Sequence, residues 1–206
     1  MRGRFIAIEG LDGSGGTTQI ALLAEALRQP GAPGGPWTVH TTAEPSTGPI
    51  GRMIREALGG RLDLGDGVLP YLFAADRQDH LEREVEPALA AGHAVLTDRY
   101  YASSLAYQSL AAPLGFVAGL NARFRAPDLT VFLDLPVEAC VERILKRGAP
   151  RDRFETEGTL REISAAYGAA LALLADRGDR IAHVDASGTP AQVHARVMEQ
   201  VAACLS

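Results

Sequence analysis

The chain has 206 residues, of which 47% are hydrophobic and 22% are charged, and its formal net charge is −5 at pH 7. This composition is typical of a globular protein, and the length fits a single domain over residues 1–206 with a substantial core. The negative charge argues against nonspecific binding of nucleic acid, and no apolar run approaches membrane-spanning length. An apolar segment begins at Arg4, which leaves no room for a signal peptide. Since Cys140 and Cys204 lie in segments of helical pattern, we expect a cytoplasmic protein without disulfides.

Strand-like and helix-like segments alternate along the whole chain. The periodicity predicts strands over residues 4–9, 37–42, 94–98, 129–134 and 180–185, and helices over 19–28, 49–58, 68–91, 101–110, 115–124, 137–147, 160–175 and 190–205, with a kink at Pro87. This alternation predicts an α/β fold, in which five parallel strands carry helices on both faces. Because ligands of such sheets bind at the carboxyl ends of the strands, we expect one edge to hold residues 10–18, Glu44, Asp98 and Asp185.

A glycine-rich loop follows the first predicted strand. The segment Gly10-Leu-Asp-Gly-Ser-Gly-Gly-Thr-Thr18 matches the phosphate-binding pattern G-x-x-x-x-G-K-[S/T] except that glycine replaces the lysine. Between a strand and a helix, backbone N–H groups and the helix N-terminus converge on an anion. The Thr17 hydroxyl is placed to reach Mg²⁺. We therefore expect a nucleotide's phosphates to bind at Gly10, Gly13, Ser14, Gly15, Gly16, Thr17 and Thr18. A simple glycine-rich turn is the alternative.

Arginine has almost entirely replaced lysine in this chain, since Lys146 stands alone against nineteen arginines. The glycine at position 16 can be part of that general loss, with arginines taking over the work. A basic cluster surrounds the Gly-Ala-Pro turn at residues 148–150, and it consists of Arg143, Lys146, Arg147, Arg151 and Arg153. Arginines on a turn that closes over a phosphoryl donor stabilise the charge that develops during transfer. The alternative is a solvated charged face.

The third predicted strand ends on Asp98, and Arg99 follows it. The aspartate is placed to hold Mg²⁺ through water beside Thr17, and the arginine to clamp a phosphate bidentately. An ordinary salt bridge at the strand end is the alternative. The histidines show no spacing typical of metal ligands, so we expect them to be surface or capping groups; they are His40, His80, His93, His183 and His194. The only metal we expect is Mg²⁺ carried by the nucleotide.

Two predicted helices carry side chains suited to a nucleoside. Phe73 and Arg77 are four residues apart and share a helix face, which suits stacking on a base and bonding its carbonyl. The alternative is a core phenylalanine and a solvated arginine. On the next helix, Ser104, Tyr107 and Gln108 lie on neighbouring positions of one face and offer hydroxyl and amide groups to a base edge and a sugar. A polar helix surface is the alternative there.

Taken together, these segments resemble the thymidylate kinase family over nearly the whole chain. The resemblance is carried, in the family's order, by residues 8–19, 43–51, 72–77, 98–108, 127–134, 151–155 and 184–187. It implies a P-loop NTPase fold and one nucleoside monophosphate kinase-like domain with a short mobile lid at about residues 147–156. It also implies a homodimer that transfers the γ-phosphoryl group of ATP to thymidine monophosphate with Mg²⁺.

The resemblance also implies where the acceptor nucleotide binds. The residues that match the family's acceptor site are Glu44, Phe73, Arg77, Arg99, Ser103, Ser104, Tyr107 and Gln108. Phe73 would stack on thymine, and Arg77 would bond its carbonyl. Ser104 and Gln108 would meet the thymine edge, and Tyr107 would crowd the 2′ position and disfavour ribonucleotides.

For the chemistry itself the resemblance points to a second set of residues. Asp12 would contact the 3′-hydroxyl of the deoxyribose, and Arg99 would hold the acceptor phosphate. Arg151 and Arg153 would belong to the lid, as in the bacterial variety of the family. Adenine would lie near Asp185 and Ala186.

The chain departs from the family pattern at two charged positions. Gly16 replaces the loop lysine, and Ala43 replaces the arginine that often precedes Glu-Pro. Losing one such donor to transition-state charge costs roughly 3–4 kcal/mol, or on the order of hundreds-fold in rate. Two outcomes follow: lid arginines or Lys146 supply the missing charge, or the protein binds nucleotides without effective turnover. A kinase for another pyrimidine nucleotide is the third possibility.

Overall fold

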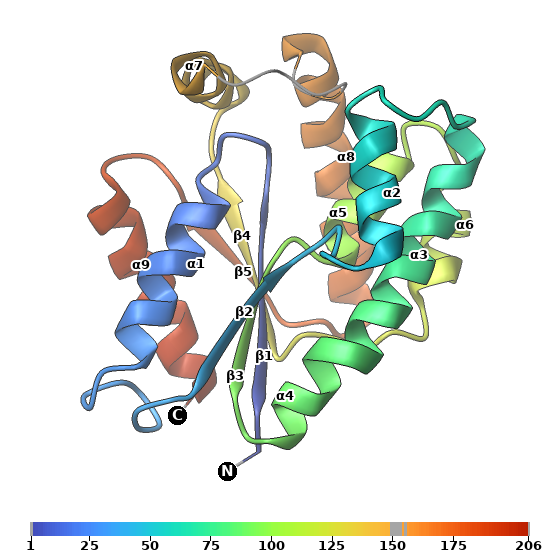
Figure 1. Ribbon diagram of the computed structural model, residues 1–206. Helices are drawn as coiled ribbons and strands as arrows, with labels where there is room; N and C mark the ends of the chain where they lie inside the picture. The colour runs from blue at the N-terminus through green and yellow to red at the C-terminus, as the bar shows by residue number, and fades with distance from the viewer. Residues whose placement is uncertain (1, 149–153, 155, 206) are drawn as a thin grey trace.

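The computed structural model describes residues 2–148, 154 and 156–205. Its centre is a five-stranded, all-parallel sheet in the order β2-β3-β1-β4-β5 (Figure 1). The strands are β1 (Arg4–Gly10), β2 (Val39–Ala43), β3 (Ala94–Asp98), β4 (Leu129–Asp134) and β5 (Ile181–Asp185). The predicted α/β class and P-loop NTPase fold are therefore confirmed.

Helices cover both faces of the sheet. On one face lie α1 (Gly16–Leu27) and α9 (Pro190–Leu205); α4 (Glu86–Ala90) and α5 (Tyr101–Gln108) contact the other (Figure 1). The remaining helices are α2 (Pro49–Leu58), η1 (Asp66–Val68), α3 (Leu69–His80), η2 (Leu81–Val85), α6 (Leu114–Asn121), α7 (Val137–Arg147) and α8 (Glu157–Asp176). None of the helices in the described ranges is long and apolar enough to cross a bilayer.

The helical stretch predicted over residues 68–91 is divided by a π-helical turn, η2. Pro87 has no N–H to donate to the carbonyl of Arg83, four residues earlier. The N–H of Glu86 instead donates to the carbonyl oxygen of Leu81, five residues earlier. The distortion that the sequence predicts at Pro87 therefore falls in the turn before it, as a widened helix.

The second strand begins later than predicted, because Trp37 is hydrogen-bonded to the preceding helix and turn. Its backbone N–H donates to the carbonyl oxygen of Leu27 (2.9 Å), and its indole Nε1–H donates to that of Pro33 (2.9 Å). Strand pairing accordingly starts at Val39, opposite Ala94.

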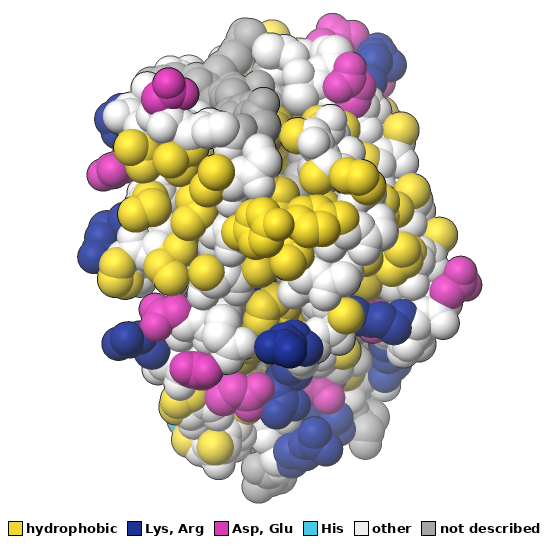
Figure 2. Space-filling model, turned by 90° about the vertical axis from the view of Figure 1, so that its right-hand side faces the viewer, with side chains coloured by type: hydrophobic (Ala, Val, Ile, Leu, Met, Phe, Trp, Pro, Cys, Tyr) yellow, Lys and Arg dark blue, Asp and Glu magenta, His cyan; other side chains and the backbone are white. Residues whose placement is uncertain are grey.

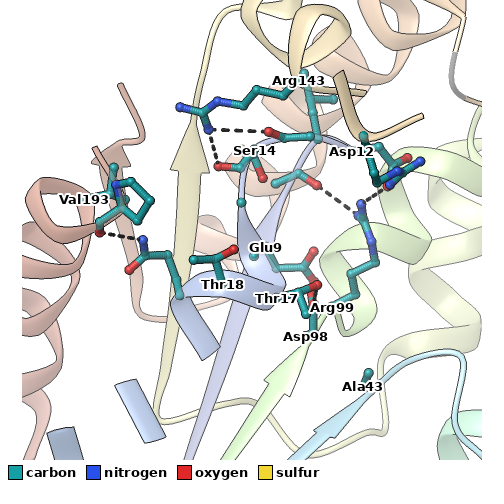
Figure 3. A pocket seen from close by; sticks show the side chains of 18 of the residues that line it. Glu9, Asp12, Ser14, Thr17, Thr18, Ala43, Asp98, Arg99, Arg143 and Val193 are labelled. Atoms are coloured by element: carbon teal, nitrogen blue, oxygen red, sulfur yellow. Dashed lines mark hydrogen bonds and ion pairs between the residues drawn. The ribbon is translucent and has the colours of Figure 1, made fainter. Parts of the chain in front are cut away.

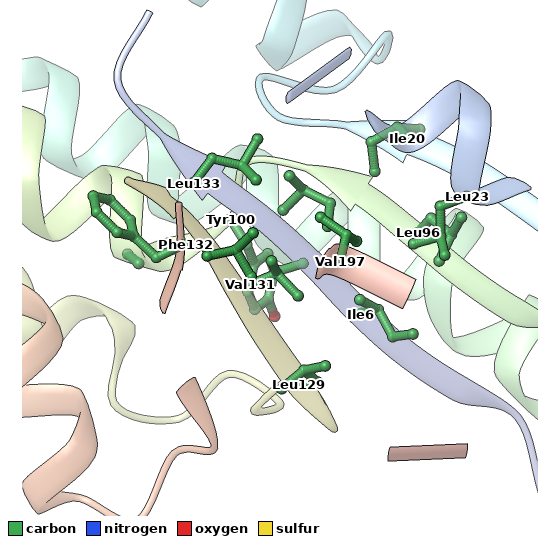
Figure 4. Packing of buried hydrophobic residues seen from close by; sticks show 14 of the residues in the cluster. Ile6, Ile20, Leu23, Leu96, Tyr100, Leu129, Val131, Phe132, Leu133 and Val197 are labelled. Carbon is green, nitrogen blue, oxygen red and sulfur yellow. The ribbon is translucent and has the colours of Figure 1, made fainter. Parts of the chain in front are cut away.

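The core lies between the sheet and its helices. Figure 4 shows Ile6 and Leu96 of the sheet packed with Leu23 of α1 and Val197 of α9, and these four side chains are fully buried. Side chains of strands buried on both faces form nearly continuous apolar runs, as in the Phe-Ile-Ala-Ile segment of β1. Each such aliphatic side chain contributes roughly 1.5–3 kcal/mol on burial. The two faces therefore fix the sheet rigidly beneath the strand ends.

Candidate active site

A cavity of about 620 Å³ opens at the carboxyl ends of the strands (Figure 3). The strand register explains the position: β3 ends at Asp98, which pairs with Ile8, while β1 continues to Gly10, which pairs with Leu133 near the end of β4. All seven predicted phosphate-loop residues line this cavity: Gly10, Gly13, Ser14, Gly15, Gly16, Thr17 and Thr18. The cavity thus lies at the carboxyl ends of the strands, where we expected ligands to bind, and the glycine loop forms its floor.

Glycine is required at two positions of this loop. Gly13 has a φ of 86°, and a Cβ there would lie 2.6 Å from the carbonyl oxygen of Cys140. Gly15 has a φ of 107° and precedes the first residue of α1. Positive φ values of this kind are available to glycine at low cost. The loop therefore turns tightly and presents the unpaired N–H groups of the first turn of α1 to the cavity, which is the geometry of an anion site.

Thr17 and Asp98 meet at the floor of the cavity. The Thr17 hydroxyl donates to Oδ2 of Asp98 over 2.7 Å, as the sequence predicted by placing them side by side (Figure 3). Within the described residues no group of three His, Cys, Asp or Glu side chains could hold a metal ion. A hydroxyl and a single carboxylate are hard oxygen ligands that suit a cation delivered with phosphate oxygens, such as Mg²⁺.

Arg143 of α7 lies against the glycine loop. Its guanidinium donates from Nη1 to the carbonyl oxygen of Ser14 (3.1 Å), and Nη1 also lies 3.5 Å from that of Gly13 (Figure 3). Its Nη2 donates to the carbonyl oxygen of Ala186 (3.1 Å). Lys146, predicted in the same basic cluster, is instead 74% exposed and pairs with Glu142 over 2.6 Å. Arg143 is therefore a cluster residue that is hydrogen-bonded to the loop.

The structure also describes some of the other residues that the sequence predicted to bind ATP. Arg147 lines the cavity together with Arg143. Asp185 is exposed, and its carboxylate accepts the N–H of Ser187 (2.9 Å). The carbonyl oxygen of Ala186 accepts a hydrogen bond from Arg143, which also bonds the loop. The predicted lid residues Arg151 and Arg153 lie outside the described residues.

A second cavity, of about 150 Å³, adjoins the first. It is lined by every residue of the predicted acceptor site, namely Glu44, Phe73, Arg77, Arg99, Ser103, Ser104, Tyr107 and Gln108. These side chains come from the segment after β2, the segment after β3, α3 and α5. Asp12, Glu44, Pro45 and Arg99 line both cavities. The fold thus joins a phosphate-loop cavity to a cavity with one aromatic wall and several hydrogen-bonding groups.

Arg77 is completely buried in the wall of the smaller cavity. Its Nη2 donates to Oε2 of Glu44 (2.5 Å) and to the Ser104 hydroxyl (2.9 Å), and its Nη1 donates to Oδ1 of Asn121. Its Nε–H has no partner, and neither has Oε1 of Gln108. Two residues that line this cavity therefore carry a buried donor and a buried acceptor whose hydrogen-bonding demand is unmet.

Arg99 and Asp12 form the boundary between the two cavities. Nη2 of Arg99 donates to Oδ1 of Asp12 (2.6 Å), and the Tyr107 hydroxyl donates to Oδ2 (2.9 Å). Burial lowers the pKa of Arg99, but Asp12 and nearby Tyr107, Tyr167 and Glu9 raise it well above its usual range, so the guanidinium stays charged. Arg99 has a φ of 69°, a conformation that costs about 1–3 kcal/mol in a residue other than glycine. A permanent cation is therefore held in place at the junction of the cavities.

Glu9 supports this junction from below, a role that the sequence analysis did not assign to it. Its carboxylate accepts the N–H of Tyr100 (2.8 Å) and both the N–H (3.1 Å) and the hydroxyl (2.5 Å) of Ser103, at the start of α5. The hydroxyl of Tyr167 also donates to it (3.1 Å). Burial raises the pKa of Glu9, although Ser103 and Arg99 act in the opposite direction. The only feature of the sequence that could have indicated this role is the position of Glu9 near the end of an apolar strand.

Arg55 of α2 is a second residue that the sequence analysis missed. It lines the larger cavity, as Ala43 does, and its Nη1 donates to the carbonyl oxygen of Ser46 over 2.6 Å. An arginine on an amphipathic helix gives no local signal of such a role, because most are solvated.

The expectation that all histidines are surface or capping groups is wrong for His80. Its side chain is fully buried, and its ring nitrogens contact Glu44 and Thr42. The error arises because a histidine in a helix carries no sign of which segment will cover it. His40, by contrast, is partly exposed and pairs with Glu84 over 2.8 Å.

The chain is similar to known proteins over almost its full length. Residues 8–197 match the family model described as thymidylate kinase. The chain is 41% identical over 200 residues to a probable thymidylate kinase of Pyrobaculum aerophilum, and the aligned part covers 96% of this chain and 95% of the relative. It is 40% identical over 204 residues to the thymidylate kinase of Xanthomonas campestris, and the aligned part covers 97% of this chain and 85% of that relative. These matches confirm the family resemblance read from the motifs.

Proposed function

The chain belongs to the thymidylate kinase family and is a phosphotransferase that phosphorylates thymidine monophosphate with ATP, and we propose that transfer takes place where its two cavities meet. ATP would bind on the glycine loop, with its γ-phosphoryl group directed toward Arg99. Thymidine monophosphate would fill the smaller cavity, with its phosphate at the same arginine. The observation that carries this proposal is the adjoining of the two cavities at Asp12, Glu44, Pro45 and Arg99.

The base would be recognised by the groups that lack partners in the smaller cavity. Thymine carries carbonyl oxygens that accept hydrogen bonds and a ring N–H that donates one. The free Nε–H of Arg77 supplies a donor, and the free Oε1 of Gln108 supplies an acceptor. Phe73 lines the cavity beside them as a stacking surface. Binding would therefore remove the desolvation penalty that both groups bear in the empty cavity.

The acceptor phosphate would lie between Arg55 and Arg99. The arginine that the family often has before Glu-Pro is Ala43 here, but Arg55 lines the same cavity as Ala43. A guanidinium from α2 thus supplies positive charge to this cavity. The loss at position 43 does not leave the phosphate to Arg99 alone.

Mg²⁺ would be held by Thr17 and Asp98 together with the phosphate oxygens of ATP. When bound, the cation neutralises charge on the phosphates during transfer. The two side chains are already in contact over 2.7 Å, so the protein offers two adjacent oxygen ligands without rearranging its backbone.

The charge of the missing loop lysine would come from arginines of α7 and the lid. Arg143 is already fastened to the loop, and Arg147 lines the same cavity. Arg151 and Arg153 would complete the set when the lid closes over ATP. Because phosphoryl transfer depends mainly on positioning and electrostatics, an arginine is an acceptable substitute.

We also propose that the protein is a cytoplasmic homodimer. Both cysteines are buried and free, as expected in a reducing compartment. Tyr71 of α3 and Phe116 of α6 are exposed and stack edge to face, with ring centroids 5.5 Å apart. Figure 2 shows hydrophobic side chains gathered on the face to which these helices belong. Apolar surface of this kind supports a subunit interface.

A coupled assay with ATP, Mg²⁺ and a panel of nucleoside monophosphates tests the assignment. Thymidine monophosphate should give the highest kcat/KM, and Arg77→Ala should lower it with a larger rise in KM for thymidine monophosphate than for ATP. Nucleotide binding by calorimetry without product would instead show a binding protein. A higher kcat/KM for another pyrimidine nucleotide would show that the acceptor has been misassigned.

A further inference from the structure

His80 is buried behind the base cavity, which it does not line. Its side chain on α3 is 0% exposed. Its Nδ1 lies 3.1 Å from Oε1 of Glu44, and its Nε2 lies 2.7 Å from the hydroxyl oxygen of Thr42. A carboxylate only accepts hydrogen bonds, so the hydrogen of this pair is on Nδ1, and His80 donates to Glu44.

Glu44 is thereby held at both of its oxygens. Oε1 accepts from His80, and Oε2 accepts from Nη2 of Arg77 over 2.5 Å. The side chain of Glu44 is only 2% exposed, so water cannot replace either donor readily. Rotation of the carboxylate away from Arg77 would break a hydrogen bond to His80 as well, and a buried charge without its donor is costly.

The far side of His80 is fastened to the sheet and to η2. Nε2 contacts Thr42 of β2 and lies 3.7 Å from Oε2 of Glu84. Glu84 in turn pairs with His40 of β2. Burial raises the pKa of Glu84, but hydrogen bonds with Thr42 and His40 and the neighbouring imidazoles lower it overall, so Glu84 stays ionised. The imidazole therefore cannot shift toward solvent without losing contacts on that side.

We propose that His80 is a positioning residue for the acceptor nucleotide: it locks Glu44, and Glu44 in turn holds Arg77 with its Nε–H available to the base. This inference rests on the function proposed above, because Arg77 matters only if the base binds beside it. His80 touches neither substrate, so its removal should weaken binding of thymidine monophosphate and leave binding of ATP intact.

The two ring nitrogens can be tested separately by substitution. In His80→Asn the side-chain amide nitrogen can take the place of Nδ1 and keep the hydrogen bond to Glu44. In His80→Gln the longer side chain reaches the place of Nε2 and leaves Glu44 without that donor. Calorimetry with thymidine monophosphate in the absence of ATP should show an affinity loss of roughly tenfold for His80→Gln and less than about threefold for His80→Asn. Steady-state assays should show the same order in KM for thymidine monophosphate, with KM for ATP unchanged.

The controls distinguish this role from a merely structural one. His93→Gln alters a histidine just before Ala94, where β3 begins, at the end of that strand opposite the cavity, and should leave both affinities unchanged. Should His80→Gln not melt cooperatively, His80→Ser, which is too short to reach Glu44, replaces it in the comparison with His80→Asn. Equal affinity losses in the Asn and Gln variants, or wild-type affinity in the Gln variant, would overturn the inference. Failure of the wild-type protein to bind thymidine monophosphate would instead overturn the proposed function.

Discussion

Gly16 and Asp98 face each other across the first turn of α1. A Cβ on Gly16 would lie 2.9 Å from Oδ1 of Asp98, so any side chain at this position must displace the end of that carboxylate. The same carboxylate accepts the Thr17 hydroxyl through Oδ2. A lysine placed here would therefore gain a contact to the phosphates and at the same time disturb the oxygen ligands proposed for Mg²⁺.

The first prediction concerns this position. Gly16→Lys should change kcat by less than about tenfold in either direction, because the gain in charge and the displacement of Asp98 oppose each other. Arg143→Ala should lower kcat about 100-fold, since it removes a cation already fastened to the loop. Coupled assays at saturating ATP measure both, and Gly16→Ala, which adds the Cβ alone, is the matched control. A rise of several hundredfold in Gly16→Lys would show that arginines do not replace the lysine.

At the scale of elements, Glu9 joins the end of β1 to the start of α5. Its carboxylate accepts the N–H groups of Tyr100 and Ser103, in the first turn of that helix, where a negative charge is favourable. Burial nevertheless raises its pKa above the ordinary value of 4.5. The folded protein therefore binds a proton more tightly than the unfolded chain does at this residue. Its contribution to the free energy of unfolding decreases as pH rises from about 4.5 through the folded pKa.

The second prediction follows from that sign. Glu9→Gln cannot titrate, so its free energy of unfolding, relative to wild type, should increase as pH rises through this window and then level off. Urea unfolding at a series of pH values measures the difference. Glu138→Gln is the matched control: hydrogen bonds to the backbone N–H of Glu138 and to Arg161 lower the pKa of that exposed carboxyl. Its stabilising effect is lost as pH falls, so the control difference should have the opposite slope. A constant difference between Glu9→Gln and wild type at every pH would contradict the prediction.

The strand segments and the glycine loop could be predicted because their signals are local. Apolar runs of strand length and a loop of glycines need no knowledge of distant segments. The partners of Arg77 could not be predicted in the same way. Asn121 lies 44 residues further along the chain, and His80 approaches Glu44 across 36 residues. Such contacts depend on which helix faces come together, which the helical period of one segment does not determine. The position of Arg55 in the larger cavity could not be predicted for the same reason.

At the scale of the whole molecule, the exposed aromatic side chains Tyr71 of α3 and Phe116 of α6 are the basis for expecting a homodimer. Tyr71 is 56% exposed and Phe116 is 39% exposed, although their rings are in contact. Phe116→Asp places a charge in the centre of the proposed interface and should convert the dimer to a monomer in analytical ultracentrifugation. Leu145→Asp alters a side chain on α7 that is 54% exposed, and it should leave the dimer intact. Because α6 also carries Asn121, a partner of Arg77, separation of the subunits should raise KM for thymidine monophosphate as well. A monomeric wild-type protein would refute the proposed homodimer, and a dimer that persists in Phe116→Asp would place the subunit contact elsewhere.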